Sequence, residues 1–150
     1  MKSIEELLRA TDHFTRLSPT EFAAVCQTVE RLTLSPGGIA AREGDPEDAL
    51  MVVESGTAQV FTFSRDGAEI VLAKLGPGAY FGEQALTAER TERRSAYVRA
   101  FSSLSLLRLS KAAFQSALAP DHPLKRSPET FVAQPLSKLF SSQSGLFQSI

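Results

Sequence analysis

The sequence has 150 residues, of which 43% are hydrophobic, and this size and composition are typical of one domain with one buried core. The formal net charge of −1 excludes a strong basic field, so nucleic acid is not expected as a partner. The apolar runs are too short to cross a bilayer and the N-terminus MKSIEELLRA is too polar for a secretory signal, which predicts a cytoplasmic protein without direct membrane insertion.

Residues that usually carry catalysis or hold a metal are few in this sequence. Cys26 is the only cysteine, so no internal disulfide is expected, and two histidines are too few for a typical cage of nitrogen and sulfur ligands. No motif pairs a nucleophile with a base, and no paired-carboxylate motif is present. The sequence therefore predicts neither an enzyme nor a metal-binding protein, and no cofactor is expected.

Two helices are predicted near the N-terminus, at 3–12 and 19–31. The apolar residues of the first helix recur on one face. They are Ile4, Leu7, Leu8 and Phe14. The second helix has a clearer start, because Ser18 can cap it, Pro19 suits the first helical position and Glu21 completes a capping box. Both helices are expected to pack on a larger element.

From residue 32 to residue 109 the helical period gives way to short strand-like runs, with glycine-bearing turns about every ten residues. The predicted strands are 38–42, 49–54, 57–63, 68–75, 96–102 and 104–109. The side chains of 57–63 alternate around the pleat, which predicts a half-buried strand. Short antiparallel strands at this spacing are typical of a sandwich or jelly roll. The fold class is therefore expected to be mainly β with flanking helices.

The chain after the last predicted strand divides into a short helix and a tail. Ser110 is expected to cap a helix at 111–118, which ends a domain spanning 1–118. Within the tail, 119–150, a proline at 135 can open a last helix at 135–150, although a glycine at 145 weakens that prediction. The tail is open to three interpretations: a lid helix, a helix that docks a partner, and a poorly ordered end.

Residues 81–100, FGEQALTAERTERRSAYVRA, combine a glycine, a carboxylate and a pair of arginines. An arginine fork with backbone N–H groups at a helix start suits a phosphate, and a fixed carboxylate suits a ribose hydroxyl. Glu83 begins a predicted turn of helix, 83–86, whose amides point at an anion, while Gly82 lets the backbone come close to a sugar. This pattern favours a site for a ribose phosphate.

The phrases FGEQAL and RSAYVRA together resemble the phosphate-binding cassette of the cyclic-nucleotide-binding domain family. The resemblance extends over about residues 4–118, through FTRLSPTEF, SPGGIAAREGDPEDALMVVESGTAQVF and LGPGAYFGE in family order. It implies an eight-stranded antiparallel β-roll flanked by helices. The ending RRSAYVRA is most similar to the corresponding segment of cyclic-nucleotide-regulated ion channels.

The resemblance also implies roles for single residues. Glu83 accepts a hydrogen bond from the ribose 2′-hydroxyl, Gly82 offers its backbone to the sugar, and Arg94 pairs with the cyclic phosphate. The amides of Ala85 and Ser95 are expected to bind the phosphate, and Leu75 is expected to contact the base. The full expected ligand-binding set is Gly82, Glu83, Gln84, Ala85, Arg94, Ser95, Ala96, Tyr97 and Leu75. Arg93 is expected to face solvent near Glu89 or Glu92.

Two departures from the family pattern bear on the ligand. The loop TAERTER between Leu86 and Arg94 is longer than in many members and lacks their common proline. Tyr97 is expected to occupy a place where relatives often carry a serine or threonine that bonds guanine. Because tyrosine is a poor substitute for that contact, cAMP is favoured over cGMP.

The resulting functional hypothesis is a regulatory sensor that binds a cyclic nucleotide and relays binding through its C-terminal segment to an effector protein, or to a domain absent from this chain. The alternative hypothesis is a protein interaction module that keeps the roll without the nucleotide. A metal-dependent jelly-roll enzyme is a third hypothesis, which the scarcity of histidines disfavours.

Overall fold

The computed structural model describes residues 3–10 and 12–125, which form a mainly β fold with flanking helices, as predicted. The helices are α1 (Ile4–Arg9), α2 (Pro19–Thr28), α3 (Lys111–Ala117) and the 3₁₀ helices η1 (Asp12–Arg16) and η2 (Glu83–Leu86). The strands are β1 (Glu30–Leu34), β2 (Ile39–Ala41), β3 (Pro46–Glu47), β4 (Ala49–Ser55), β5 (Ala58–Phe63), β6 (Glu69–Leu75), β7 (Tyr80–Phe81), β8 (Glu92–Arg93), β9 (Tyr97–Ala100) and β10 (Leu104–Ser110).

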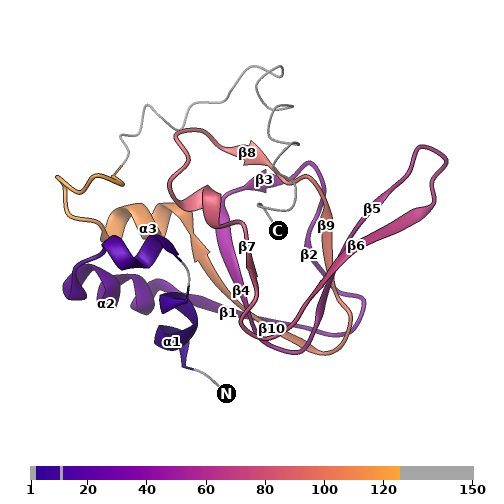
Figure 1. Ribbon diagram of the computed structural model, residues 1–150, viewed down its shortest axis with the longest axis horizontal. Helices are drawn as coiled ribbons and strands as arrows, with labels where there is room; N and C mark the ends of the chain where they lie inside the picture. Colours follow the sequence, from indigo (N-terminus) through magenta and orange to yellow (C-terminus); the bar gives the residue numbers. More distant parts are fainter. Residues whose placement is uncertain (1–2, 11, 126–150) are drawn as a thin grey trace.

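Two four-stranded antiparallel sheets form the roll (Figure 1). One sheet has the strand order β1-β10-β4-β7 and the other has the order β2-β9-β5-β6. Strands β3 and β8 form a separate two-stranded ribbon. In Figure 1 the three α-helices lie together on one side of the roll, and the β5–β6 hairpin projects on the opposite side. The described residues thus contain more strands than the eight that the resemblance implies, because β3, β7 and β8 are two-residue strands.

The buried core has two parts, which lie on opposite faces of the β1-β10-β4-β7 sheet. Side chains alternate along β4, so Leu50 and Val52 face the helices while Met51 and Val53 face the second sheet. The helical side of the core includes Leu7, Leu8, Phe14, Phe22, Val25, Leu107, Leu109, Phe114 and Leu118. The interior of the roll includes Ala58, Val60, Phe81, Ala96, Val98, Ala100, Leu104 and Leu106. The fold is therefore built as three layers, with helices, one sheet and a second sheet.

Serine side chains cap the two helices for which the sequence predicts it. The Ser18 hydroxyl accepts a hydrogen bond from the Glu21 amide, and the Glu21 carboxylate accepts one from the Ser18 amide at 2.9 Å. The Ser110 hydroxyl accepts from the amide of Ala113 at 3.1 Å. Each such cap stabilises its helix by about 1 kcal/mol. Within residues 3–10 and 12–125, no helix is long and apolar enough to cross a membrane.

Both N-terminal helices are shorter than the predicted 3–12 and 19–31. Helix α1 ends at Arg9, and the separate 3₁₀ helix η1 follows it. Helix α2 ends at Thr28, because Val29 is extended (φ −67°, ψ 132°) and leads into β1. Strand β1 pairs along its whole length with β10. This strand is missed in the sequence because its stabilisation comes from a partner far along the chain, which local periodicity does not reveal.

Strand β5 also differs from the half-buried strand that alternation predicts, because its first four residues are all buried. Val60 faces the interior of the roll. On the opposite face, long side chains of β9 cover Gln59 and Phe61: Arg99 donates to Gln59 Oε1 at 2.8 Å, and the Tyr97 ring stacks on Phe61 with centroids 5.2 Å apart. On the outer face of the β2-β9-β5-β6 sheet, cross-strand pairs therefore shield Gln59 and Phe61 from solvent.

The described chain continues to pack beyond residue 118. Leu124 is 8% exposed and belongs to the helical side of the core. The segment 119–125 thus returns to the body of the domain after α3. The predicted helix at 135–150 lies outside the described residues.

Candidate functional site

Gly82 joins β7 to η2 in a conformation that requires glycine. Its φ of 80° and ψ of 14° lie in the left-handed region. A Cβ atom added at this position would lie 2.4 Å from the Ala49 carbonyl oxygen and 2.6 Å from Arg94 Nη1. Any side chain at 82 would therefore clash with the backbone of β4 and with the guanidinium of Arg94, and at least one of them would have to move.

Arg94 is the buried cation of this site, with 7% of its surface exposed. Its Nη2 donates to the Ala49 carbonyl oxygen at 3.0 Å, and its Nη1 lies 3.6 Å from Glu47 Oε1. The guanidinium carbon stands 5.6 Å from the centre of the Phe81 ring, within the range of a cation–π contact. Within the described residues Nη1 makes no hydrogen bond. The guanidinium is thus fixed on one side and has donor capacity left on the other.

The ribbon of β3 and β8 sets the direction of Arg94. Pro46 pairs with Arg93 in this ribbon, and two backbone hydrogen bonds extend it: Arg94 N donates to Asp45 O at 2.7 Å, and Gly44 N donates to Arg94 O at 2.8 Å. Arg93 is exposed, as predicted, and its Nη1 donates to the Gly44 carbonyl oxygen at 2.7 Å. The structure therefore buries Arg94 and leaves Arg93 at the surface.

Burial controls the electrostatics of the site. It lowers the pKa of the Arg94 guanidinium, an effect that the Glu47 charge opposes. It also raises the pKa of the Glu47 carboxyl, which the Arg94 charge opposes and the Glu92 charge reinforces. Arginine stays protonated across the physiological range in spite of such a shift. Arg94 is therefore a permanent positive charge in a dry environment, where an anion is bound more strongly than at the surface.

The helical turn η2 occupies residues 83–86, as predicted, but its amides are not all directed outward. The Ala85 amide donates to the Gly82 carbonyl oxygen at 3.0 Å. The Glu83 side chain is half-buried and makes no hydrogen bond or ion pair with another described residue, while Gln84 is exposed. Glu83 is thus available as an acceptor, whereas Ala85 can donate to an anion only if the turn rearranges.

The segment after Arg94 separates its side chains between the two faces of the second sheet. Ala96 and Val98 belong to the interior of the roll. Tyr97 pairs with Phe61, stacks on its ring and lies on the outer face, away from that interior. Ser95 is half-buried beside Arg94. Because position 97 lies on the outer face, the residue type there gives no reason to prefer cAMP over cGMP.

Leu75 stands at the opposite end of β5 from Tyr97. It pairs with Ala58, three residues from Phe61, which corresponds to about 10 Å along a strand. Its side chain packs against the interior core. The structure thus brings Gly82, Arg94 and η2 together. It places Leu75 against the interior of the roll, at a distance from Tyr97.

Two groups at the site are missed by the sequence analysis: Glu47, which faces Arg94, and the carbonyl of Ala49, which accepts from it. Residues 43–46 form one of the glycine-bearing turns visible in the sequence, but a turn signal does not show which side chain it directs inward. A glutamate inside the run EDALMVV is the one available hint, since charged residues are rarely buried without a partner.

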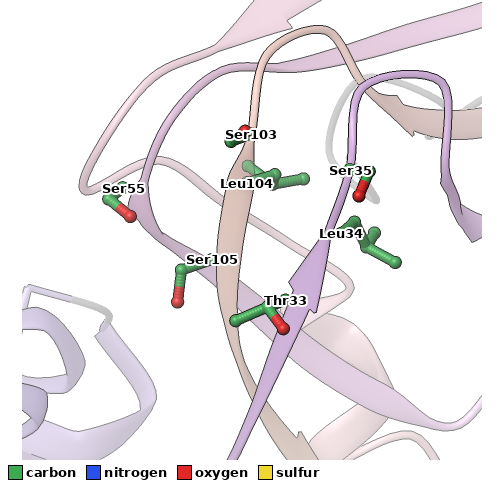
Figure 2. Close-up of a pocket in the computed structure, with 7 residues that line it drawn as sticks. All are labelled: Thr33, Leu34, Ser35, Ser55, Ser103, Leu104 and Ser105. Carbon is green, nitrogen blue, oxygen red and sulfur yellow. The ribbon is translucent and has the colours of Figure 1, made fainter.

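A separate pocket of about 360 Å³ opens where β1 and β4 end and β10 begins (Figure 2). Its lining is rich in hydroxyl groups and carries no charged side chain; it consists of Thr33, Leu34, Ser35, Ser55, Ser103, Leu104 and Ser105. No cassette residue lines it.

Among the described residues, no group of three or more His, Cys, Asp or Glu residues is arranged to hold a metal ion.

The sequence and the fold both match known proteins. The sequence profile described as "Cyclic nucleotide-binding domain" matches residues 31–121. The chain is 34% identical over 110 residues to a cyclic nucleotide-gated potassium channel of Mesorhizobium japonicum, covering 73% of this chain and 28% of the channel. It is 30% identical over 146 residues to the cAMP-dependent protein kinase type II regulatory subunit of Drosophila melanogaster, covering 97% of this chain and 38% of that subunit.

A solved structure gives the same result. The cyclic nucleotide-binding-like protein from Brucella abortus superimposes with a TM-score of 0.70 and 26% identity, covering 77% of this chain and 97% of that one. Fold and site thus define a β-roll domain with a buried arginine at a glycine-led helical turn. This chain belongs to the cyclic nucleotide-binding domain family. It spans 28% and 38% of the length of the two curated relatives, which are a channel and a kinase regulatory subunit.

Proposed function

We propose that this chain binds a cyclic nucleotide and acts as a regulatory sensor, without catalysing a reaction. One observation carries the proposal: the buried guanidinium of Arg94 holds a donor, Nη1, that has no hydrogen-bond acceptor among the described residues. A buried donor without an acceptor costs about 1–3 kcal/mol. A phosphate oxygen beside Nη1 would satisfy this donor and share a charge-assisted hydrogen bond with it.

The rest of the cassette supports the same ligand. The free carboxylate of Glu83 suits the ribose 2′-hydroxyl, and the side chain and amide of Ser95 lie next to Arg94 in the chain. The Ala85 amide would have to leave the Gly82 carbonyl before it could reach the phosphate. A rearrangement of η2 is therefore part of the proposed binding step.

We propose cAMP as the preferred ligand over cGMP. The support comes from the Drosophila relative, whose name is that of a cAMP-dependent kinase subunit, rather than from Tyr97. Calorimetric titration with both nucleotides tests the proposal, with saturable binding of cAMP and weaker binding of cGMP expected. No heat with either nucleotide at about millimolar concentration, equivalent to a binding free energy weaker than about −4 kcal/mol, would instead favour the nucleotide-free interaction module.

The relay to the C-terminal segment is proposed to run through Gln115 on α3. Its Nε2 donates to the carbonyl of Leu86, at the end of η2, at 2.9 Å, and to the carbonyl of Leu124 at 3.0 Å. Gln115 is 5% exposed, so both hydrogen bonds are shielded from water. A rearrangement of η2 on ligand binding would therefore act directly on the segment 119–125.

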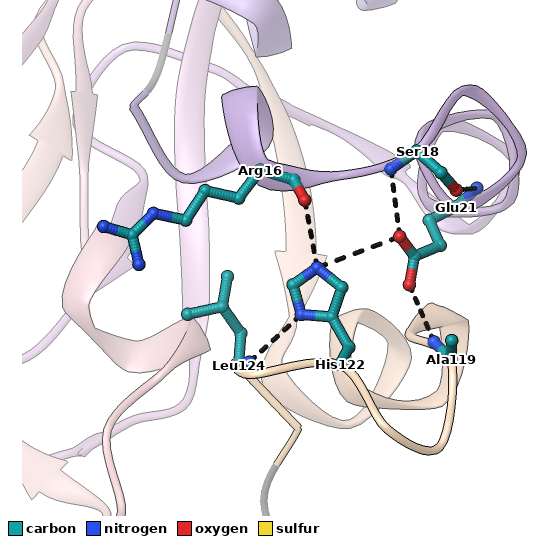
Figure 3. A network of polar contacts seen from close by, with 6 residues as sticks. All are labelled: Arg16, Ser18, Glu21, Ala119, His122 and Leu124. Carbon is teal, nitrogen blue, oxygen red and sulfur yellow. Dashed lines mark hydrogen bonds and ion pairs between the residues drawn. The ribbon is translucent and has the colours of Figure 1, made fainter.

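A second set of contacts holds the same segment against the N-terminal helices (Figure 3). His122 Nδ1 lies 3.0 Å from the Leu124 amide nitrogen, and its Nε2 lies 3.0 Å from the Arg16 carbonyl oxygen and 3.8 Å from Glu21 Oε1. The Glu21 carboxylate accepts from the Ala119 amide at 2.7 Å, and this bond lowers the pKa of Glu21. These contacts give segment 119–125 a defined position from which a ligand can shift it.

Replacing Gln115 tests this relay. In Gln115→Leu the carbonyls of Leu86 and Leu124 lose their common donor, at a cost to stability of about 1–3 kcal/mol. We expect the cAMP-dependent change in amide hydrogen exchange at 119–125 to fall to less than about half of its wild-type size. Gln27→Leu makes the same chemical change on an exposed face of α2 and is expected to leave it intact. Equal responses in the two variants would contradict the relay.

The output is proposed to be an effector protein or a further domain. The relatives named here are a potassium channel and a kinase regulatory subunit, and both are longer than the part that matches this chain. Segment 119–125, which touches both η1 and α2, is the surface through which we expect the effector to be reached.

A further inference from the structure

The buried guanidinium of Arg94 has a carboxylate beside it even without a ligand. Glu47 is 5% exposed, and its Oε1 lies 3.6 Å from Arg94 Nη1. Neither of these two atoms makes a hydrogen bond within the described residues. The pair is thus held by charge alone, and the carboxylate stands next to the donor atom that the proposed function gives to the phosphate.

The surroundings of Glu47 contain more negative than positive charge. Glu92 lies directly opposite Glu47 in the β3–β8 ribbon, and its Oε2 is also buried without a hydrogen bond in the described structure. The charged groups that act on the Glu47–Arg94 pair are Glu92, Asp45, Asp48 and Arg108. Arg108 is itself 3.6 Å from Asp48, so Arg94 faces the buried Glu47 carboxylate, with the buried Oε2 of the half-buried Glu92 on the opposite strand of the ribbon.

We propose that Glu47 is an internal anion that competes with the ligand for Arg94, so that binding of the nucleotide is coupled to uptake of one proton by the Glu47 carboxyl. This inference rests on the proposed function and adds a regulatory residue to it. The one bond formed is the O–H bond of the Glu47 carboxyl, and its proton comes from solvent.

Charge balance explains the coupling. With Glu47 ionised, the Glu47–Arg94 pair is neutral, and a cyclic phosphate would bring an uncompensated negative charge into a buried site, which is costly. Protonation of Glu47 removes its charge and frees Arg94 for the phosphate. By linkage, the ligand then raises the pKa of Glu47, so affinity increases as pH falls and levels off below the pKa of the free protein.

The first test uses the unmodified chain and cAMP. Calorimetric titrations are made from about pH 5 to about pH 8, in two buffers of different ionisation enthalpy at each pH, because the difference in heat counts the protons exchanged. We expect net proton uptake and an affinity that rises by up to about tenfold per unit decrease in pH in the titrating range. Binding without proton uptake at every pH contradicts the proposal.

The second test removes the charge with little change in shape. Glu47→Gln is expected to bind cAMP more tightly than wild type at about pH 8, by about tenfold for each unit of pKa rise removed, and to lose the pH dependence. Glu43→Gln removes one charge from an exposed position of the same turn and should behave as wild type. A Glu47→Gln variant that keeps the wild-type pH dependence, or binds more weakly throughout, overturns the inference.

The same experiment separates failure of the inference from failure of the proposed function. If cAMP binds both wild type and Glu47→Gln equally, without proton uptake, the sensor stands and the role of Glu47 falls. If neither protein gives heat with cAMP at any pH, while both melt cooperatively, the proposed function itself fails.

Discussion

Arg94→Ala is expected to lose most of its affinity for cAMP. The guanidinium is buried, and the phosphate would lose the charge-assisted hydrogen bond that Arg94 is proposed to give it. The expected loss is about 2–5 kcal/mol, or roughly thirtyfold to several thousandfold in Kd. The loss of the bond to the Ala49 carbonyl should also lower the melting temperature. Calorimetry gives the affinity and thermal denaturation gives the stability.

Arg93→Ala is the matched control for this prediction. Arg93 is the neighbouring residue with the same side chain, but it is exposed and donates to the Gly44 carbonyl oxygen. Its replacement should change cAMP affinity by less than about 1 kcal/mol, as is usual for a surface contact. Normal binding by Arg94→Ala together with loss of binding by Arg93→Ala would show that the cassette is read in the wrong register.

Gly82→Ala is expected to damage both the fold around the site and the binding of cAMP. The left-handed conformation alone costs about 1–2 kcal/mol for a residue with a Cβ. The methyl group would in addition come within 2.4 Å of the Ala49 carbonyl oxygen and 2.6 Å of Arg94 Nη1, so one of them must move. We therefore expect a loss of stability above about 2 kcal/mol in urea unfolding, together with a large loss of cAMP affinity.

Gly67→Ala separates the two causes. Gly67 has nearly the same φ, 86°, but an added Cβ meets nothing within 4 Å. This variant should lose only the stability that the left-handed backbone conformation costs alanine, about 1–2 kcal/mol, and should bind cAMP as wild type does. If the two variants lost the same stability and the same affinity, the close approach at Gly82 would have no importance.

The parts of the fold that could be predicted from sequence are those that local chemistry decides. Ser18 and Ser110 begin helices because their hydroxyls bond amides three residues further on. The run at β4 forms a strand because its β-branched and apolar residues are buried on both faces. The helical turn after Gly82 follows from the glycine and the residues 83–86.

The parts that could not be predicted depend on partners far along the chain. Strand β1 exists because it pairs with β10, and the ribbon of β3 and β8 exists because Pro46 meets Arg93 across the sequence. The motif places Tyr97 in the expected ligand-binding set, whereas its pairing with Phe61 puts its side chain on the outer face. A motif is a pattern of neighbouring residues along the chain, whereas the pairing register of the strands decides the face on which each side chain lies.

Glu47 shows the same limit at the site itself. Local sequence places it beside a turn, and only the pairing with Glu92 and the burial of Arg94 bring it against the guanidinium. The residues that the family pattern singles out are thus those expected to attract an anion to the site. The residue that opposes this attraction is visible only in the folded structure.

An NMR titration of the ¹⁵N-labelled chain with cAMP tests the central claim, that the cassette holds the cyclic phosphate, most directly. If the cassette holds the phosphate, the largest amide shifts are expected at Gly82, Glu83 and Ala85 and at 94–96, with smaller shifts at 119–125 through the contact of Gln115. Shifts confined to other surfaces, such as the hydroxyl-lined pocket of Figure 2, or no shifts at about millimolar cAMP, would contradict it.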